Sequence, residues 1–333
     1  MKHVYIITDI GVNHNGKLET AKELVDVALD AGVDAVKLQL FNPEEIASES
    51  APLAEYQKDS GQTSQIDMLR ALTLTQEEYK EILAYTTEKG IDLIVTPYDI
   101  ESAKFLVSIG VAPLKIPSCE VTNLPFLKGV AALGVPVILS SGTCNLEEVD
   151  DAVTIFKDAG VDLILLHCTS SYPTPFDQVN LRVMETLEKK FSVPVGLSDH
   201  TPGIAVPIAA AALGAVVIEK HFTLDKNAEG PDHKASLEPD EVKSMVEGVR
   251  AAEAALGSSE KIIQPAEQNT ADIARRSVVA TIDLSSGEQL TVENTAIKRP
   301  GTGISPKEYE AAIGKAVNQD ISVGTPITHD MLL

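Results

Sequence analysis

The chain has 333 residues, a formal net charge of -22, and hydrophobic and charged fractions of 44% and 23%. These fractions are ordinary for a globular protein, whereas the strong negative charge disfavours nucleic acid or an anionic membrane as a partner. A few lysines gathered in one cleft are still enough to bind a small anion. No apolar run approaches the ~20 residues that span a membrane, and the first residues lack a signal-peptide pattern. Cys119, Cys144 and Cys168 have no paired spacing, so we expect free thiols in a cytoplasmic protein.

Apolar strand-like segments alternate with amphipathic helical segments along the first 256 residues. Eight strands are expected, at Val4–Gly11, Ala35–Phe41, Asp92–Tyr98, Ala112–Ser118, Pro136–Gly142, Leu163–Thr169, Pro194–His200 and Ala215–Thr223. Helices are expected between them, for example over Leu18–Ala31, Thr75–Lys89, Leu146–Ala159 and Pro239–Leu256. The strands are continuously apolar, which indicates burial on both faces and a parallel sheet.

Eight such repeats predict an α/β fold of the (β/α)8 TIM-barrel class over residues 1–256. A doubly wound open sheet is the alternative. It usually carries a Gly-x-Gly-x-x-Gly turn after an early strand, and Gly11–Gly16 lacks that spacing.

The composition changes after Leu256. Residues 257–274 are polar and have no sustained helical period, so we expect a linker there. Residues 275–333 contain an internal repeat, because Asp283–Thr291 returns 37 positions later as Asp320–Thr328. The repeat predicts a small β-rich module in which each half is a strand, a tight turn and a strand.

Two of the expected strands end in histidine beside a carboxylate. His200 follows Asp199, and His221 lies two residues after Glu219. In a TIM barrel the carboxyl ends of the strands converge on one rim, where the chemistry lies. His200 and His221 are therefore predicted to bind a divalent metal ion, and the alternative is a pair of hydrogen-bonded structural histidines.

Polar residues also interrupt the other strands near their carboxyl ends. Lys37 and Lys115 lie within apolar strands, where a lysine is costly to bury without a partner. Together with hydroxyl groups they predict a cradle for a phosphate or carboxylate; the set is Lys37, Thr96, Lys115, Ser118, Ser140 and Ser198. The alternative is that both lysines pair with acidic residues inside the barrel. Cys168 is disfavoured as a nucleophile, since no base is apparent beside it.

Several motifs occur in an order that resembles the sialic acid synthase family, which makes N-acetylneuraminate, legionaminate or pseudaminate. They are Asp9–Gly16 (DIGVNHNG), Lys37–Gln39, Lys115–Ser118 (KIPS), His167–Pro173 (HCTSSYP), Ser198–Thr201 (SDHT), Glu219–Thr223 (EKHFT), Gly230–His233 (GPDH) and Lys298–Gly303 (KRPGTG). The resemblance covers nearly the whole chain. It identifies residues 275–333 with the family's antifreeze-like (SAF) domain.

The resemblance implies that the enzyme condenses phosphoenolpyruvate with a 2-acetamido hexose, either N-acetylmannosamine or a diacetamido-trideoxy hexose. It implies that His200 and His221 bind Mn2+ or Mg2+, and that the six residues of the cradle bind phosphoenolpyruvate. The implied catalytic residues are Asp9, Glu219 and Gln39, and the implied sugar-binding residues are Gln39, Tyr172, Asp232 and Arg299. Arg299 would come from the partner in a homodimer with swapped C-terminal domains.

Two features depart from the family pattern. The family usually has Glu where this chain has Asp9, and Asp is one methylene shorter. Ser170 and Ser171 before Tyr172, with the segment 54–57 (AEYQ), favour a bacterial sugar over N-acetylmannosamine. Two other functions remain open from the sequence: a metal-dependent pyruvate aldolase, and a non-catalytic carbohydrate-binding or coat-assembly protein weakened by Asp9.

Overall fold

The computed structural model describes residues 3–48, 51–53 and 64–333. The chain divides into two compact units, Met1–Gly257 and Ser258–Leu333. Within the described ranges, no helix combines the length and apolar character needed to cross a membrane.

The first unit is a closed barrel of parallel strands in the order β1 to β8, with β8 paired to β1. The strands are β1 (Tyr5–Gly11), β2 (Ala35–Leu40), β3 (Asp92–Pro97), β4 (Leu114–Ile116), β5 (Val137–Ser140), β6 (Leu163–Cys168), β7 (Val195–Asp199) and β8 (Val217–His221). The closure confirms the predicted TIM barrel and excludes the doubly wound sheet.

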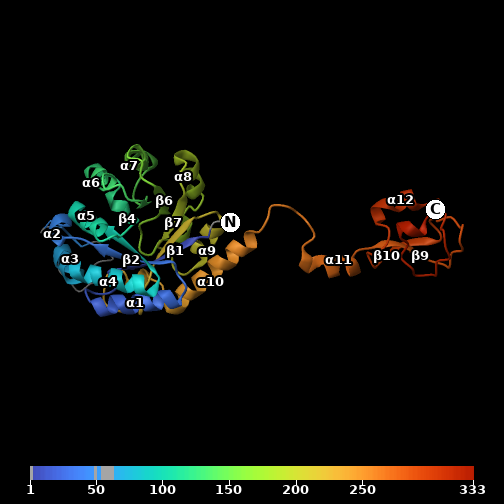
Figure 1. Ribbon diagram of the computed structural model, residues 1–333, viewed down its shortest axis with the longest axis horizontal. Coiled ribbons are helices and arrows are strands. Elements are labelled where there is room, and N and C mark those ends of the chain that lie inside the picture. Colours follow the sequence, from blue (N-terminus) through green and yellow to red (C-terminus); the bar gives the residue numbers. More distant parts are fainter. Residues whose placement is uncertain (1–2, 49–50, 54–63) are drawn as a thin grey trace. The chain divides into compact units, whose positions relative to one another are not determined.

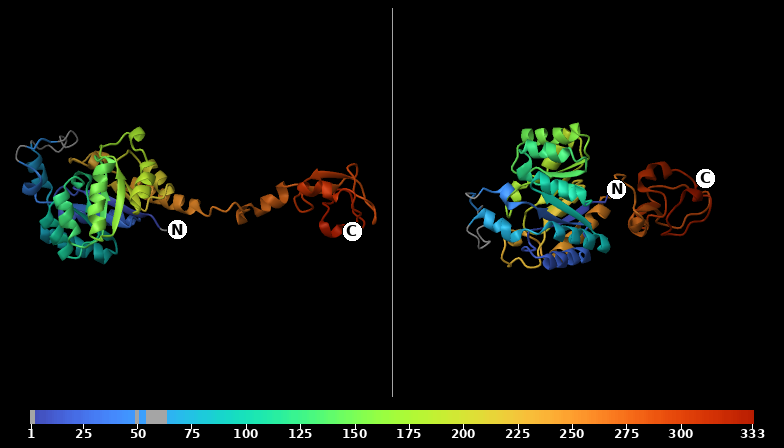
Figure 2. Two further views of the ribbon diagram at one scale, coloured as in Figure 1. Left: turned by 90° about the horizontal axis from the view of Figure 1, so that it is seen from above. Right: turned by 60° about the vertical axis from the view of Figure 1, so that its left-hand side comes forward.

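Helices surround the strands (Figures 1 and 2). They are α1 (Leu18–Asp30), α4 (Gln76–Lys89), α5 (Ile100–Ser108), α6 (Leu124–Ala131), α7 (Leu146–Asp158), α8 (Val183–Phe191), α9 (Ala205–Ala212) and α10 (Pro239–Leu256). The connection between β2 and α4 adds α2 (Pro43–Ile46) and α3 (Gln65–Leu72). Side-chain caps begin several helices; in α7, Asn145 and Glu148 form a reciprocal capping box.

The fourth strand is shorter than predicted. Its ladder covers Leu114–Ile116 only, because Pro113 and Pro117 flank it and proline has no N–H to donate to a ladder. Ser118 therefore begins a 3-10 turn, Ser118–Glu120, instead of ending the strand.

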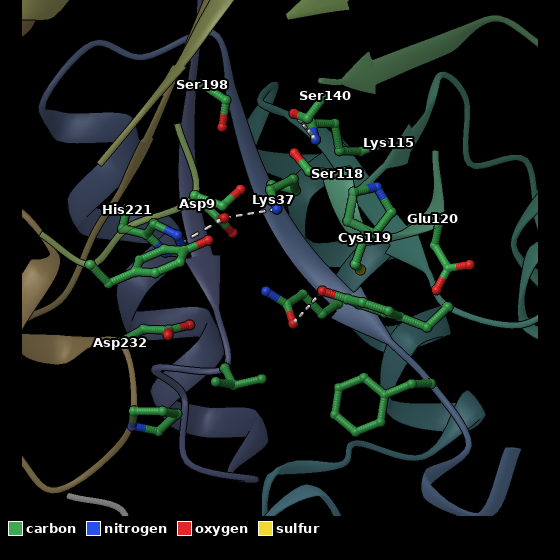
Figure 3. Close-up of a pocket in the computed structure, with 18 of the residues that line it drawn as sticks. Asp9, Lys37, Lys115, Ser118, Cys119, Glu120, Ser140, Ser198, His221 and Asp232 are labelled. Atoms are coloured by element: carbon green, nitrogen blue, oxygen red, sulfur yellow. Dashed lines mark hydrogen bonds and ion pairs between the residues drawn. The ribbon is translucent and has the colours of Figure 1, made fainter. Parts of the chain in front are cut away.

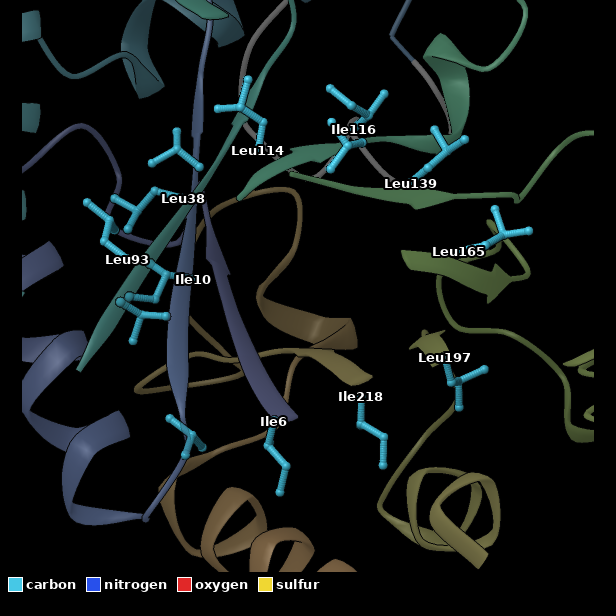
Figure 4. Close-up of a cluster of buried hydrophobic side chains, with 14 of the residues drawn as sticks. Ile6, Ile10, Leu38, Leu93, Leu114, Ile116, Leu139, Leu165, Leu197 and Ile218 are labelled. Carbon is cyan, nitrogen blue, oxygen red and sulfur yellow. The ribbon is translucent and has the colours of Figure 1, made fainter. Parts of the chain in front are cut away.

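Alternation along the strands separates two apolar layers. One set of side chains packs outward against the helices, including Ile6, Ile10, Leu38, Leu165 and Ile218 (Figure 4). The other set fills the barrel interior and consists of Ile7, Ala35, Ile94, Ile138, Leu166 and Val217. In a strand, the residue two positions after an interior residue also points into the barrel. The interior cluster therefore forms an apolar floor beneath the next layer of inward side chains.

The second unit holds a two-stranded antiparallel sheet, β9 (Ser277–Ala280) and β10 (Thr295–Lys298), and a short helix α12 (Tyr309–Ala312). The sequence repeat is present as pseudo-symmetry. The Asp283 carboxylate accepts from the Val323 N–H at 2.7 Å, and Asp320, its equivalent, accepts from the Ser286 N–H at 2.9 Å. Each half forms isolated bridges around a glycine turn and not the predicted pair of regular strands, because these carboxylates take backbone donors that a ladder would use.

Part of the predicted linker is helical. The helix α11 (Gln268–Ala274) follows a capping box between Gln264 and Glu267. Its side chains are largely exposed and none is buried, so the sequence carries no apolar period from which the helix could be predicted.

Candidate active site

A layer of polar side chains lies directly above the apolar floor of the barrel. Each strand places one residue there, two positions after its interior residue where the ladder is regular: Asp9 after Ile7, Lys37 after Ala35, Thr96 after Ile94, Ser140 after Ile138, Cys168 after Leu166, Ser198 after Gly196 and Glu219 after Val217. Lys115 comes from the short strand β4. All of these side chains are buried, which makes this layer the electrostatic centre of the barrel.

The two lysines face two carboxylates. Lys37 Nζ lies 2.7 Å from Asp9 Oδ2 (Figure 3). It also lies 3.8 Å from Glu219 Oε1. Lys115 Nζ lies 3.7 Å from the same Glu219 oxygen and donates to Ser140 Oγ at 2.7 Å. The lysines are thus paired with acidic residues, as the alternative interpretation expected, and they also line a cavity.

These pairings decide the charge states. Burial favours the neutral amine, but Asp9 and Glu219 outweigh it and raise the pKa of Lys37. Burial also favours neutral Asp9, yet Lys37 and His221 outweigh it and hold the pKa of Asp9 below its ordinary value. For Lys115 burial dominates, so its pKa is lowered.

The hydroxyl groups of the predicted cradle are held at defined positions. Ser198 Oγ donates to Glu219 Oε1 at 3.1 Å. Ser118 Oγ accepts from the Gly142 N–H at 2.8 Å. Thr96 belongs to the layer but does not line the cavity, and its Oγ1 accepts from Lys37 Nζ at 3.4 Å.

The two histidines converge at the rim. The ring centroids of His200 and His221 lie 5.3 Å apart, and the Tyr172 ring lies 4.3 Å from the His200 ring. His200 Nδ1 lies 3.1 Å from the Thr169 carbonyl oxygen, which favours the tautomer that leaves Nε2 as an acceptor. Burial lowers the pKa of His221, and a neutral imidazole is the form that binds metal.

Buried polar atoms without a hydrogen-bond partner gather at this rim. Among the described residues they include Asp9 Oδ1, Glu219 Oε2 and His221 Nδ1. Leaving such groups unpaired costs about 1–3 kcal/mol each, so they indicate that a polar ligand completes the site. The described residues contain no cluster of three or more His, Cys, Asp or Glu side chains arranged as a metal site. The two converging imidazoles are the side chains that could hold an ion, whose other ligands would have to come from water and substrate.

The cavity above this layer has a volume of about 550 Å3 and two chemically different sides. The predicted site residues form one side: Asp9, Lys37, Gln39, Lys115, Ser118, Ser140, Tyr172, Ser198, His200, Glu219, His221 and Asp232 all line it. The other side is an apolar wall, which consists of Val12, Phe41, Ile46, Met68, Leu69 and Leu72. The Tyr98 hydroxyl joins the two sides, since it donates to Gln39 Oε1 at 3.3 Å.

Some predicted residues lie elsewhere. Asp199 points away from the cavity and pairs with Lys220 at 2.6 Å, because it alternates with the inward Ser198 and His200. Arg299 lies in the C-terminal unit, where its Nε donates to the Ala274 carbonyl at 3.0 Å. The segment 54–57 lies outside the described residues.

Three other histidines of the motifs have local hydrogen-bonding partners. His14 Nδ1 accepts from the Gly16 N–H, His167 Nε2 contacts the Val179 carbonyl, and His233 Nδ1 contacts the Thr223 hydroxyl.

Sequence reasoning missed the apolar wall and Glu120. Glu120 lines the cavity from the turn after β4, and burial raises its pKa. Its position two residues after Ser118, a predicted site residue, could have marked it as part of the site. The wall comes mainly from the irregular connection after β2, where no periodic pattern marks a role.

Comparison with known proteins gives the family. The sequence model of the NeuB family matches residues 24–261, and that of the SAF domain matches residues 275–333. The N,N'-diacetyllegionaminic acid synthase of Legionella pneumophila is 44% identical over 330 residues, which is 97% of this chain and 93% of the relative. The enzyme of that name from Campylobacter jejuni is 43% identical over 325 residues, 96% of this chain and 97% of the relative.

Comparison with a solved structure supports the same family. The crystal structure of an N-acetylneuraminic acid (sialic acid) synthetase from Leptospira borgpetersenii, in complex with citrate, matches with a TM-score of 0.73 at 36% identity, over 80% of this chain and 90% of that chain. The chain therefore belongs to the NeuB family, and it is an enzyme of the sialic acid synthase type whose barrel is followed by a SAF domain.

Proposed function

We propose that the enzyme condenses phosphoenolpyruvate with a 2,4-diacetamido-2,4,6-trideoxyhexose, giving a nine-carbon 2-keto acid and phosphate. One observation carries the proposal: a cavity whose floor holds two buried lysines and whose rim holds two converging imidazoles is also lined by an apolar wall. An acidic ligand fits the floor, a metal ion fits the rim, and a sugar with several methyl groups fits the wall.

The floor is suited to phosphoenolpyruvate. Lys37 and Lys115 supply ammonium donors, and the hydroxyl groups of Ser118, Ser140 and Ser198 line the same cavity. Charge-assisted hydrogen bonds of this kind are about twice as strong as neutral ones. Because Asp9 and Glu219 already face the lysines, a second source of positive charge favours binding of a multiply charged anion.

That source is a divalent cation, Mn2+ or Mg2+, held by His200 and His221. When bound, the ion acts as a Lewis acid that polarises the sugar aldehyde. The Thr169 carbonyl would orient the His200 ring through its contact with Nδ1, and the carboxylate of Asp9 lies near His221, with Oδ2 3.5 Å from Nδ1.

The reaction makes one carbon–carbon bond, and at C2 it replaces the carbon–oxygen bond to phosphate with a bond to the oxygen of water. C3 of phosphoenolpyruvate bonds to the aldehyde carbon, whose oxygen takes up a proton; water adds to C2, and phosphate leaves with the bridging oxygen to give the 2-keto acid. Asp9 is the group assigned to the water. One of its oxygens is fixed by Lys37 and the other has no partner among the described residues, so the second oxygen is available to accept a proton.

The acceptor is assigned from the apolar wall and from the relatives. Gln39, Tyr172 and Asp232 lie on the polar side and would bind the sugar's hydroxyl and amide groups. Phe41, Met68 and the other wall residues would contact two acetyl methyls and the 6-methyl group, each buried methyl contributing about 0.8 kcal/mol. The two legionaminic acid synthases at 44% and 43% identity support this choice over N-acetylmannosamine.

Phosphate release tests the proposal. Purified protein with Mn2+, phosphoenolpyruvate and the diacetamido sugar is expected to release phosphate, faster than with N-acetylmannosamine, and chelation of the metal should stop it. Free pyruvate in place of phosphoenolpyruvate is expected to give no product; product from pyruvate would favour the aldolase instead. No phosphate with either sugar would refute the proposal.

A further inference from the structure

The loop after β8, residues 222–237, carries Asp232 into the cavity. Asp232 Oδ2 and Gln39 Nε2 each lie 3.3 Å from the place that a Cβ on Gly11 would occupy. Gly11 has a φ of +55° and no side chain, so it leaves room for these two polar groups to come together. Figure 3 shows Asp232 on this loop, on the same side of the cavity as His221.

One buried amide ties the two ends of this loop together. Asn13, in the loop after β1, is 3% exposed. Its Nδ2 donates to the Phe222 carbonyl at 2.8 Å, at the start of the loop, and to Ser236 Oγ at 3.0 Å, near its end. Both acceptors require the NH2 group, which fixes the orientation of the amide.

Ser236 in turn makes a hydrogen bond to the backbone of Asp232. Its Oγ donates to the Asp232 carbonyl at 2.7 Å, four residues earlier in the chain. A hydroxyl has a single hydrogen to donate, so Ser236 must accept from Asn13 while it donates to Asp232. The donor and the acceptor are therefore fixed in both hydrogen bonds, from Asn13 to Ser236 and from Ser236 to Asp232.

A second tie holds the middle of the loop. His233 Nδ1 contacts the Thr223 hydroxyl at 2.6 Å, and its Nε2 lies 3.4 Å from Asn15 Oδ1. Asn15 also donates to the Glu229 carbonyl at 3.0 Å. The loop is thus fastened to the β1 loop on both sides of Asp232.

We propose that Asn13 and Ser236 are positioning residues that act through Asp232 and determine the affinity for the sugar, with no part in binding phosphoenolpyruvate. The inference rests on the proposed function, in which Asp232 contacts the sugar. The phosphoenolpyruvate residues come from β2, β3, β4, the turn after β4, β5 and β7, and none of their hydrogen bonds described above involves Asn13 or Ser236.

The test compares Ser236→Ala with Ser244→Ala. Ser244 lies in α10, and its Oγ donates to the Asp240 carbonyl, four residues earlier, at 2.8 Å. Ser236 makes the same type of hydrogen bond, but the one at Ser244 is exposed and receives no hydrogen bond from Asn13. Loss of the buried bond at Ser236 is expected to raise the KM for the sugar about tenfold and to leave the KM for phosphoenolpyruvate unchanged. Ser244→Ala should change neither.

Asn13→Asp provides a second variant of nearly equal volume that cannot donate to Phe222 or Ser236. It is expected to show the same split between the two KM values, with the melting temperature of each variant confirming a folded barrel. Equal increases in both KM values, or no increase, would overturn the inference while leaving the proposed function in place. Absence of turnover by the wild-type enzyme with every sugar would overturn both.

Discussion

Substitution of Gly142 by alanine tests the geometry of the phosphoenolpyruvate cradle. A Cβ at this position would lie 2.3 Å from Ser170 Oγ, 2.9 Å from Ser118 Oγ and 3.0 Å from Cys168 Sγ. These atoms are the ends of short side chains, so they will rotate away, and the one that belongs to the cradle is the Ser118 hydroxyl, which also accepts from the Gly142 N–H. A displacement of about 1 Å at a binding group can cost about 100-fold in rate.

We therefore expect Gly142→Ala to raise the KM for phosphoenolpyruvate by about 10- to 100-fold. The expected loss in the free energy of unfolding is about 1–3 kcal/mol, typical of overpacking. Steady-state phosphate release against each substrate, together with urea denaturation, measures both quantities.

Gly129→Ala is the matched control. Its Cβ would also be crowded, at 2.8 Å from Ile100 Cδ1, but against a flexible apolar side chain outside the cavity. It should change neither KM. A folded Gly142→Ala enzyme with a normal KM for phosphoenolpyruvate would refute the placement of Ser118 in the cradle.

Three further predictions concern stability and assembly. Lys220→Met should lower the free energy of unfolding by about 3–5 kcal/mol, since it strands the buried carboxylate of Asp199, and adding Asp199→Asn should restore part of the loss in urea denaturation. Burial lowers the pKa of His14 from 6.5 to about 4. Above pH 6.5 the imidazole is neutral in both the folded and the unfolded chain, and as the pH falls toward 4 the fold loses up to about 3 kcal/mol of stability because only the unfolded chain takes up the proton. His14→Gln should flatten this dependence of the unfolding free energy on pH. If Arg299 acts in the partner's site, mixing and reassembling inactive His221→Ala and Arg299→Ala subunits should recover about a quarter of wild-type activity.

A specific result would contradict each of these predictions. Equal stability of Lys220→Met and wild type would show that the pair contributes nothing. An unchanged pH profile in His14→Gln would mean that His14 is not the titrating group. No recovery of activity on mixing, with mixed dimers present by mass, would rule out the swapped arrangement.

The barrel was predictable because its signals are repeated and local. Continuous apolar strands such as Leu163–Cys168, each followed by an amphipathic helix, specify parallel strands and their order. The inward direction of Lys37, Lys115 and Glu219 follows from alternation within a strand, and so does their meeting in one layer. The helix α11 was not predictable in this way, because it buries no side chain and leaves no apolar period.

The site was only partly predictable for a similar reason. Strand-end residues such as His200 and His221 could be placed at one rim from topology alone. The direction of Asp199 follows from alternation as well, because it lies between the inward Ser198 and His200 and so faces outward to Lys220. The apolar wall comes from a connection without periodicity, and the bonds between Asn13 and Ser236 join residues more than 200 positions apart; neither has a local signal.

Formation of the carbon–carbon bond is the central claim and can be observed directly. Phosphoenolpyruvate labelled with 13C at C3 and the diacetamido hexose labelled with 13C at C1 are incubated with the enzyme and Mn2+, and the mixture is followed by 13C NMR. We predict a product whose two labels show one-bond 13C–13C coupling, appearing in step with free phosphate. Phosphate release with no such coupling would show that the enzyme hydrolyses phosphoenolpyruvate without joining it to the sugar.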